Sequence, residues 1–155
     1  MVKYLVMDVD GTLTDGKIYM SENGELMKAF SIKDGCGIKM KLIPYGIIPI
    51  IITGRYSIIV LNRCKELGIS ELYQGVTDKT KTLLSLTEDL SSVAFIGDDL
   101  NDLDCMKAVK TAGGIVGCPK DAAKEVICFA DFVSDKYGGD GAVRDFIEYI
   151  VDSGL

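Results

Sequence analysis

Tyr4-Leu-Val-Met-Asp8-Val-Asp10-Gly11-Thr12-Leu-Thr14 gives the clearest indication of how this chain folds. Its apolar part predicts a buried strand, and the polar residues after it predict a turn. Asp8 and Asp10 lie two residues apart, so their side chains project from the same side of an extended chain. Two carboxylates this close require a cation or a shared proton. The alternative interpretation is a strand followed by an ordinary Asx-rich turn. Open α/β sheets bind ligands outside the carboxyl ends of their strands, so the pair marks a candidate site.

The composition limits the class of protein and its partners. At 155 residues we expect a single domain over residues 1–155 with a sizeable core. The net charge of −6 argues against a nucleic-acid-binding surface, which requires a basic face. The longest apolar stretch, residues 47–52, is too short to span a membrane, and the early first strand leaves no room for a signal peptide. We therefore expect a cytoplasmic protein with no nucleic-acid or membrane partner.

The set of reactive side chains narrows the chemistry. The chain has no histidine, which excludes Ser-His and Cys-His catalysis and histidine-bound metals. Its five cysteines are odd in number and form no C-x-x-C pair, so we expect reduced thiols. Any catalysis must therefore use carboxylates, lysine, hydroxyls and a metal ion.

Strand-like and helix-like segments alternate along the chain. This alternation predicts a three-layer, Rossmann-like α/β fold with a mainly parallel central sheet. Pro49 has no N–H to donate, so we expect the second strand to become regular only after it. The expected strands are residues 3–8, 50–53, 72–74, 93–97, 114–116 and 131–133. The expected helices are residues 36–42, 57–67, 79–87, 101–108, 120–126 and 142–152.

One segment interrupts this alternation. Residues 17–30 place Asn23-Gly24 between two β-prone arms, which is typical of a β-hairpin. Because the segment directly follows the acidic pair, we expect a flap over the site, at about residues 17–32. A plain surface hairpin is the alternative.

Two later strand ends carry residues suited to an anionic ligand. Thr53-Gly54-Arg55 combines a hydroxyl, a glycine that admits a close ligand and a cation, although such a motif alone is often only a turn. Lys79 falls in the first turn of an expected helix, after an N-cap at Thr77 or Asp78, where its charge opposes the helix dipole. A bound phosphate and nearby carboxylates would offset that cost, whereas a solvated surface lysine is the alternative.

The fourth expected strand ends in Gly97-Asp98-Asp99-Leu-Asn101-Asp102, a second cluster of oxygen ligands. Some of these side chains could instead cap the next helix, and Asp104 is expected on the helix surface. Oxygen donors without histidine or cysteine favour Mg²⁺. A calcium EF-hand beginning at Asp8 is excluded, because Leu13 and Tyr19 occupy the positions of the loop's glycine and glutamate.

Together these four elements resemble the haloacid dehalogenase (HAD) superfamily of phosphotransferases. The matching motifs cover nearly the whole chain and are Asp8-Val-Asp10-Gly-Thr-Leu-Thr14, Thr53-Gly-Arg55, Lys79 and Gly97-Asp98-Asp99-x-Asn101-Asp102. The resemblance implies that Asp8 is a nucleophile that forms an aspartyl-phosphate. It also implies that Asp10 is the general acid and then the general base.

The same resemblance implies how the site holds its metal and its phosphate. The implied Mg²⁺ ligands are the Asp8 carboxylate, the Asp10 carbonyl and Asp98, and their outer support is Asp99, Asn101 and Asp102. The implied phosphoryl ligands are Thr53, the Gly54 N–H and Lys79, which makes Lys79 the third catalytic residue.

The spacing of the motifs leaves no room for a cap domain. The hairpin and one helix use all the residues between the first two motifs, and only 18 residues separate Lys79 from Asp98. An uncapped site is open to water unless another subunit covers it, so we expect a homo-oligomer, with a tetramer favoured. The glycine-rich stretch from Tyr137 to Gly141 could reach a neighbouring site or simply lead into the last helix.

Finer motifs are similar to those of the 3-deoxy-D-manno-octulosonate 8-phosphate (KDO-8-P) phosphatases. They include Lys28-Ala-Phe30, Asp34-Gly-x-Gly-Ile38 and Gly141-Ala-Val-Arg144. The similarity implies a Mg²⁺-dependent phosphatase of sugar-acid phosphates. Arg55 and Arg63 would pair with the sugar carboxylate, although Arg63 could equally be a surface charge of its helix.

Other functions stay open at this point. Related enzymes act on nine-carbon acylneuraminate or KDN 9-phosphates, but Thr53-Gly-Arg55 resembles the octulosonate branch. A non-catalytic HAD-like oligomerisation module is disfavoured because every catalytic position is intact. A phosphorylated receiver domain is disfavoured because its second acidic strand end before Lys79 is missing.

Overall fold

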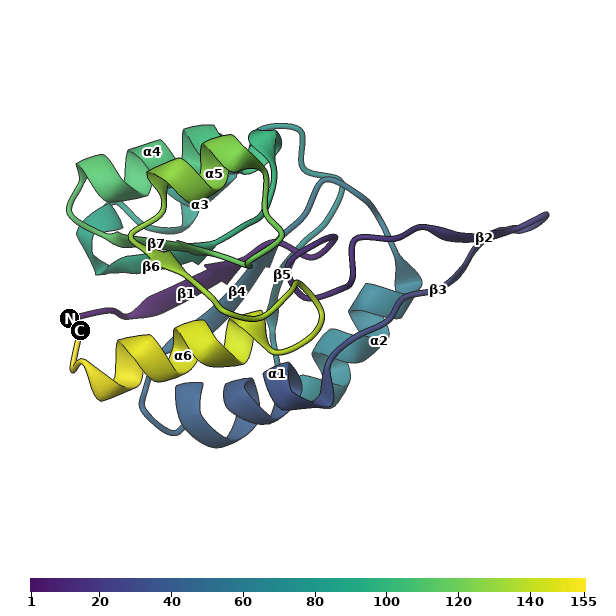
Figure 1. Cartoon of the computed structure of the whole chain (residues 1–155), viewed down its shortest axis with the longest axis horizontal. Coiled ribbons are helices and arrows are strands. Elements are labelled where there is room, and N and C mark those ends of the chain that lie inside the picture. The colour runs from purple at the N-terminus through teal and green to yellow at the C-terminus, as the bar shows by residue number, and fades with distance from the viewer.

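Six strands, all paired in parallel, form the central sheet in the order β5-β4-β1-β6-β7-β8 (Figure 1). The computed structural model describes residues 1–155. β1 (Tyr4–Met7) lies between β4 (Ile48–Ile52) and β6 (Val93–Ile96). The direction in which the chain adds strands reverses beside β1, and open α/β sheets bind ligands at such a switch point. The carboxyl ends of these three strands therefore define where the site lies.

The remaining elements cover and extend this sheet. The other strands are β5 (Glu71–Tyr73), β7 (Ile115–Cys118) and β8 (Phe132–Val133). The helices are α1 (Ile32–Gly37), a π-helical segment (Ile38–Leu42), α2 (Ile58–Leu67), α3 (Lys79–Leu86), α4 (Leu103–Thr111), α5 (Lys124–Phe129) and α6 (Ala142–Asp152), with 3₁₀ turns at Leu90–Ser92 and Leu100–Asp102.

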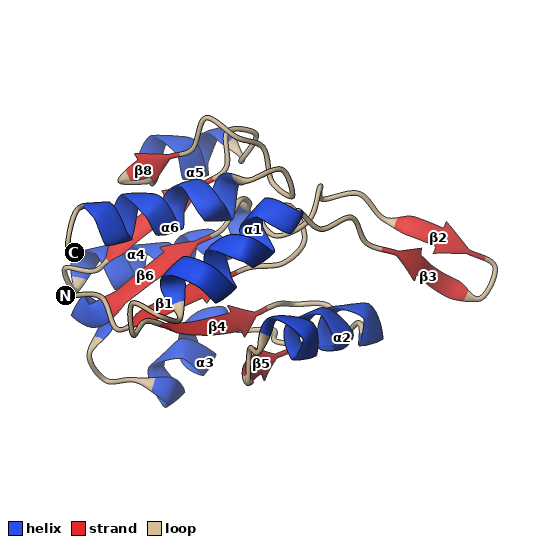
Figure 2. Ribbon diagram, turned by 90° about the horizontal axis from the view of Figure 1, so that it is seen from below, coloured by secondary structure: helices blue, strands red, loops and turns tan.

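Alternation along the strands produces the three layers. Leu5 and Met7 of β1 pack with the π-helical segment, α2 and α6, the face seen in Figure 2. Val6, between them, packs with α3, α4 and α5 on the opposite face. All three side chains are fully buried, because β1 is covered on both faces. The predicted three-layer fold is confirmed, and no separate cap domain is present. No helix is long and apolar enough to cross a membrane.

The predicted hairpin is present, but its tip points away from the body of the molecule (Figures 1 and 2). It consists of β2 (Tyr19–Ser21) and β3 (Gly24–Met27). Ser21 pairs with Gly24, so the turn is Glu22-Asn23 and not the expected Asn23-Gly24. Gly24 has φ +110°, a backbone conformation that suits glycine just after a tight turn. The hairpin tip therefore does not lie over the strand ends.

The first helix begins four residues earlier than expected, at Ile32. Ser31 caps it by accepting a hydrogen bond from the Lys33 N–H. Gly35 and Gly37 lower the intrinsic helix propensity of this turn, so the sequence pattern did not predict it as helical. The structure uses both glycines for close packing: a Cβ on Gly37 would lie 2.7 Å from Arg144 Cδ of α6.

Two further boundaries were wrong for tertiary reasons. β4 includes Pro49, which pairs with Leu5 of β1, while β5 pairs only from Ile50 onward. The missing N–H of Pro49 therefore leaves no sheet hydrogen bond unmade. α5 begins at Lys124 and not near residue 120, because the Lys120 and Ala123 N–H groups donate to carbonyls of other segments.

Candidate active site

The carboxyl ends of β1, β4 and β6 surround a polar cavity of about 260 Å³ without a hydrophobic residue in its lining. Every lining residue except Gly16 is a site residue predicted from the sequence. These residues are Asp8, Asp10, Thr53, Gly54, Arg55, Asp98, Asp99 and Asn101. The parallel register of the sheet thus brings together residues that are up to 93 positions apart in the chain.

Lys79 joins two of the acidic side chains beside this cavity. Its Nζ lies 2.7 Å from Asp8 Oδ1 and 2.7 Å from Asp102 Oδ1, and all three side chains are buried. Asp78 is the N-cap of α3, so Lys79 occupies the first helical position as predicted. Burial opposes its charge, but the two carboxylates outweigh burial and raise the pKa of Lys79. These ion pairs offset the unfavourable position of the lysine in the helix dipole.

Asp8 and Asp98 are strongly perturbed acids. Burial, together with the charge of Asp102, raises the pKa of Asp8 to about 6, although Lys79 acts in the opposite direction. Burial and the charge of Asp8 raise the pKa of Asp98 to about 8. Both shifts arise because carboxylates that share a buried site cannot all ionise at low cost.

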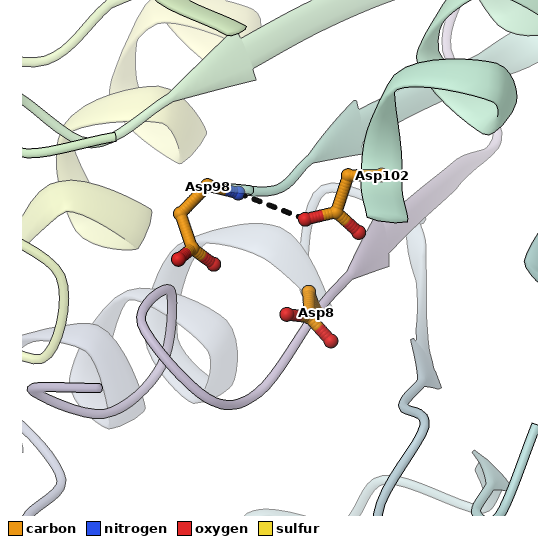
Figure 3. Close-up of side chains that lie close together, drawn as sticks. All are labelled: Asp8, Asp98 and Asp102. Carbon is orange, nitrogen blue, oxygen red and sulfur yellow. Dashed lines mark hydrogen bonds between the residues drawn. The ribbon is translucent and has the colours of Figure 1, made fainter. Parts of the chain in front are cut away.

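The acidic cluster fits a divalent cation. Carboxylate oxygens of Asp8, Asp98 and Asp102 lie within 4.8 Å of one another (Figure 3). Both carboxylate oxygens of Asp102 already have protein partners. Its Oδ1 binds Lys79, and its Oδ2 accepts hydrogen bonds from the Asp98 and Asp99 N–H groups at 3.0 and 3.2 Å. Asp8 and Asp98 are therefore the carboxylates available to a metal. An all-oxygen donor set of this kind suits Mg²⁺.

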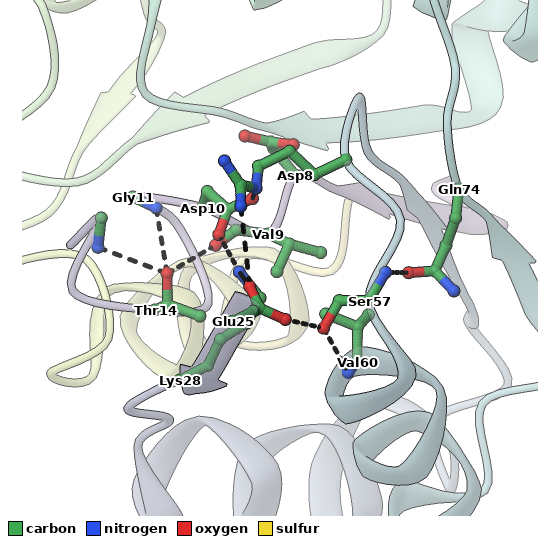
Figure 4. Close-up of polar contacts among 12 residues, drawn as sticks. Asp8, Val9, Asp10, Gly11, Thr14, Glu25, Lys28, Ser57, Val60 and Gln74 are labelled. Carbon is green, nitrogen blue, oxygen red and sulfur yellow. Dashed lines mark hydrogen bonds and ion pairs between the residues drawn. The ribbon is translucent and has the colours of Figure 1, made fainter. Parts of the chain in front are cut away.

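Asp10 lies in a second charge network, which reaches the base of the hairpin (Figure 4). Lys28 Nζ lies 2.5 Å from Asp10 Oδ1 and 2.8 Å from Glu25 Oε1, and only 3% of its side chain is exposed. Arg55 lies 3.9 Å from both Asp10 and Glu25. Glu25 also accepts a hydrogen bond from Ser57 Oγ, the N-cap of α2. The hairpin is therefore tied to the acidic pair and to α2.

Burial shapes the protonation of this network as well. Burial opposes ionisation of Glu25, but hydrogen bonds from Lys28 and Ser57 outweigh it and lower the pKa of Glu25. Burial likewise opposes the charge on Lys28, but Asp10 and Glu25 raise the pKa of Lys28. Glu25 and Lys28 are not among the site residues predicted from the sequence. Lys28 stood in a motif that carried the resemblance, which was the one signal for it.

Arg63 is the predicted site residue that neither lines this cavity nor bonds to the residues that do. Its guanidinium pairs with Glu66 at 2.8 Å and donates to the Ser31 carbonyl at 3.3 Å. It lines a neighbouring cavity of about 410 Å³, together with Lys28 and Phe30. Its role in binding a sugar carboxylate stays a prediction.

Some residues of the acidic loop after β6 line the cavity, and others cap or lie on the helix that follows. Asp99 accepts a hydrogen bond from the Leu100 N–H and forms a capping box with Asp102. Asn101 lines the cavity. The Asp104 side chain is 90% exposed, as expected for a helix surface.

The glycine-rich stretch before α6 packs on the loop that carries Asp10. The Gly139 N–H donates to the Thr12 carbonyl at 3.0 Å. A Cβ on Gly138 would lie 1.8 Å from the Gly11 carbonyl oxygen, so only glycine permits this approach. The stretch therefore leads into α6 while supporting its own chain's site.

No protein-family model matches the chain. Over 154 residues the chain is 42% identical to the 3-deoxy-D-manno-octulosonate 8-phosphate phosphatase KdsC of Escherichia coli K12. The aligned region covers 97% of this chain and 79% of that protein. The chain belongs to this phosphatase family. Membership confirms the resemblance and the predicted enzyme class, a hydrolase of phosphoric monoesters.

Solved structures of KDO-8-P phosphatases share the fold. That of Moraxella catarrhalis, in complex with magnesium, phosphate and KDO, is 40% identical with a TM-score of 0.90 over 98% of this chain and 87% of that one. The cobalt-bound form from Haemophilus influenzae is 34% identical, with a TM-score of 0.91, and the match covers 98% of this chain and 88% of that one. A HAD superfamily hydrolase of Legionella pneumophila, described as putative, is 35% identical with a TM-score of 0.89 over 98% and 83%.

Proposed function

We propose that this chain is a Mg²⁺-dependent phosphatase that hydrolyses 3-deoxy-D-manno-octulosonate 8-phosphate through an aspartyl-phosphate at Asp8. The observation that carries the proposal is the buried Asp8 carboxylate, held 2.7 Å from Lys79 and grouped with Asp98 at the switch point of the sheet. The names of the relatives and the KDO, magnesium and phosphate bound to the M. catarrhalis enzyme support it.

In the first step, a carboxylate oxygen of Asp8 attacks phosphorus and the bond to the sugar oxygen breaks. Asp10 gives its proton to that leaving oxygen. In the second step, Asp10 takes a proton from the water that attacks the aspartyl-phosphate. Phosphate leaves, and the Asp8 carboxylate is restored. Asp10 lines the same cavity as Asp8, as both roles require.

Lys79, Thr53 and the Gly54 N–H would bind the transferring phosphoryl oxygens. Thr53 is 2% exposed at the end of β4, so its position is defined by the sheet. Nothing but the Val76 carbonyl lies within 4 Å of a Cβ built on Gly54, which leaves its backbone open to a ligand. Fixed donors of this kind stabilise the charge of the transition state without reorganising.

The Asp8 carboxylate, the Asp10 carbonyl and Asp98 would hold Mg²⁺. Asp99, Asn101 and Asp102 would support these ligands from outside. Bound there, Mg²⁺ would neutralise charge on the phosphoryl oxygens and on the acidic cluster. Asp102 fits a supporting role, since its oxygens already bind Lys79 and two backbone N–H groups.

Arg55 and Arg63 would recognise the carboxylate of the sugar. Arg55 is 46% exposed at the rim of the cavity, where it is free to contact a substrate. Arg63 lines the neighbouring cavity, and Lys28 belongs both to that cavity and to the network around Asp10. A long sugar acid could therefore extend from the phosphate site toward Arg63.

The test is a comparison of kcat/KM with Mg²⁺ for octulosonate 8-phosphate, nine-carbon sugar-acid 9-phosphates and hexose phosphates. We expect the octulosonate to be preferred, and Asp8→Asn to abolish turnover while the circular dichroism spectrum is unchanged. Preference for a nine-carbon substrate would contradict the proposed substrate. No phosphate release from any substrate by the folded chain would contradict the proposed activity.

We also propose that the chain forms a homo-oligomer, with a tetramer favoured. The projecting hairpin exposes Ile18, Met20, Leu26 and Met27 by 47% to 62%, although a two-stranded hairpin has no core of its own. Light scattering should give an oligomer that Leu26→Lys dissociates, whereas Leu84→Lys on α3 should not. A monomeric parent chain would contradict the proposal. The cytoplasmic location and the absence of a nucleic-acid partner stay predictions from composition.

A further inference from the structure

Thr12 is a buried hydroxyl that faces the acidic cluster. The residue is fully buried, and its Oγ1 donates a hydrogen bond to Asp98 Oδ1 at 2.8 Å. Asp98 comes from the other side of the switch point, 86 residues away in the chain. The hydroxyl is thus the direct link between the loop after β1 and the carboxylate after β6.

The same loop shapes the space that holds the Asp98 carboxylate. A Cβ on Gly11 would lie 2.0 Å from Asp98 Oδ2, so the bare Cα of Gly11 makes room for that oxygen. Thr12 contacts one carboxylate oxygen and Gly11 borders the other. The orientation of Asp98 is therefore defined by two consecutive residues of one loop.

The backbone of this loop is itself held from outside. The Gly139 N–H donates to the Thr12 carbonyl, and Gly138 packs against the Gly11 carbonyl. Within the loop, the Thr12 and Leu13 N–H groups donate to the Val9 carbonyl. The backbone that carries the Thr12 hydroxyl is therefore held by contacts from within the loop and from the segment before α6.

We propose that Thr12 is a positioning residue for Asp98: its hydroxyl orients the Asp98 carboxylate toward a divalent cation shared with Asp8. The inference rests on the proposed function, because Asp98 needs orienting only if it binds a metal. Groups that hydrogen-bond to metal ligands fix their geometry, and their loss commonly weakens metal binding by about 10- to 100-fold. A buried threonine that only satisfies its own hydroxyl would have no such effect.

The experiment measures Mn²⁺ binding directly, by isothermal titration calorimetry and by electron paramagnetic resonance, and the Mg²⁺ concentration for half-maximal activity. Thr12→Val keeps the shape and removes the hydroxyl, and Thr12→Ser keeps the hydroxyl. We expect Thr12→Val to weaken Mn²⁺ binding about 10-fold and to raise the half-maximal Mg²⁺ concentration similarly, with kcat recovering at saturating Mg²⁺. Thr12→Ser should keep both values within about 2-fold of the parent, by the same reasoning.

Ser92→Ala is the matched control, because it removes a buried hydroxyl at the opposite end of β6. It should leave Mn²⁺ binding unchanged. If Thr12→Val does not fold, Thr12→Ser and Thr12→Ala form a second pair that differs by the hydroxyl alone, and Ala should bind Mn²⁺ more weakly than Ser. Equal Mn²⁺ affinity in the parent and the hydroxyl-free variant would overturn the role of Thr12. A parent chain that binds no Mn²⁺ would overturn the metal site as well.

Discussion

Lys28 Nζ lies 2.5 Å from Asp10 Oδ1, so a residue of the hairpin pairs directly with the proposed general acid. The hairpin tip extends into solvent, yet the arm that contains β3 is anchored at the site through Lys28 and Glu25. A segment that sequence patterns assign to a flap thus reaches the chemistry through ion pairs of two side chains and not by lying over the cavity. Motions or contacts of the hairpin can therefore be transmitted to Asp10.

Replacing Lys28 by Met should lower kcat about 10-fold, because Asp10 loses its partner and general acid–base catalysis depends on the placement of that carboxyl. Activity on p-nitrophenyl phosphate should fall less, since its leaving group needs no proton. Lys17→Met, at an exposed position on the opposite arm of the hairpin, is the control. Equal losses on both substrates would argue that Lys28 only stabilises the fold.

Replacing Lys79 by Met should destabilise the metal-free protein by about 3 kcal/mol or more, because it leaves Asp8 and Asp102 buried without a cation. Mg²⁺ should recover part of that loss. Urea unfolding with and without Mg²⁺ measures both effects. Lys81→Met, two residues along α3 and exposed, should change neither. An unchanged metal-free stability would show that the two ion pairs contribute nothing.

Asp98→Asn should make the metal-free chain more stable and abolish its response to Mg²⁺. Burial and the charge of Asp8 raise the pKa of Asp98 from 3.8 to about 8, so near neutral pH this group costs the folded state free energy that an asparagine avoids. In the parent, Mg²⁺ at 100 times its Kd should add about 2.7 kcal/mol. Thermal unfolding with EDTA or Mg²⁺ tests this. A variant that responds to Mg²⁺ like the parent would place the metal elsewhere.

Asp34 should make stability depend on pH. It is buried beneath the start of α6, accepts a hydrogen bond from the Arg144 N–H, and leaves Oδ2 without a partner. Burial raises its pKa to about 6 in the folded chain, against the ordinary 3.8. The folded state therefore holds this proton more tightly, and its stabilising effect, present below pH 4, is lost as the pH rises to 6.

The matching measurement is urea unfolding of the parent and Asp34→Asn at several pH values. The difference in unfolding free energy should shift in favour of Asn by up to about 3 kcal/mol between pH 4 and pH 7. A difference that does not change with pH would mean that Asp34 is not protonated in the folded chain near pH 5.

Gly139→Ala should cost more than Gly75→Ala, although both glycines have φ +67°. A Cβ on Gly139 would lie 2.5 Å from the Asp15 nitrogen, whereas a Cβ on Gly75 meets nothing within 4 Å. Gly75→Ala should therefore show only backbone strain, about 1 kcal/mol, and Gly139→Ala clearly more. Chemical unfolding gives both values. Equal costs would mean that the loop before α6 can move away from the loop after β1.

Much of the site could be predicted because each part is local. Asp8, Thr53 and Asp98 each end an apolar strand, and a buried strand followed by a polar turn is readable from its own residues. Lys79 stood out because it breaks a local helix rule. The boundaries failed where the reason was not local: Gly37 packs on α6, and Pro49 lies where β5 has not yet begun to pair.

Local sequence patterns were enough to predict the order of the strands along the chain, the residues at their carboxyl ends and the absence of a cap, because periodicity and spacing act over short distances. The folded structure alone sets which charges meet. It paired Lys28 with Asp10, directed Arg63 to Glu66 and joined Thr12 to Asp98. Such pairs depend on how separate elements pack, and the free energy of a buried charge depends on what lies around it in space.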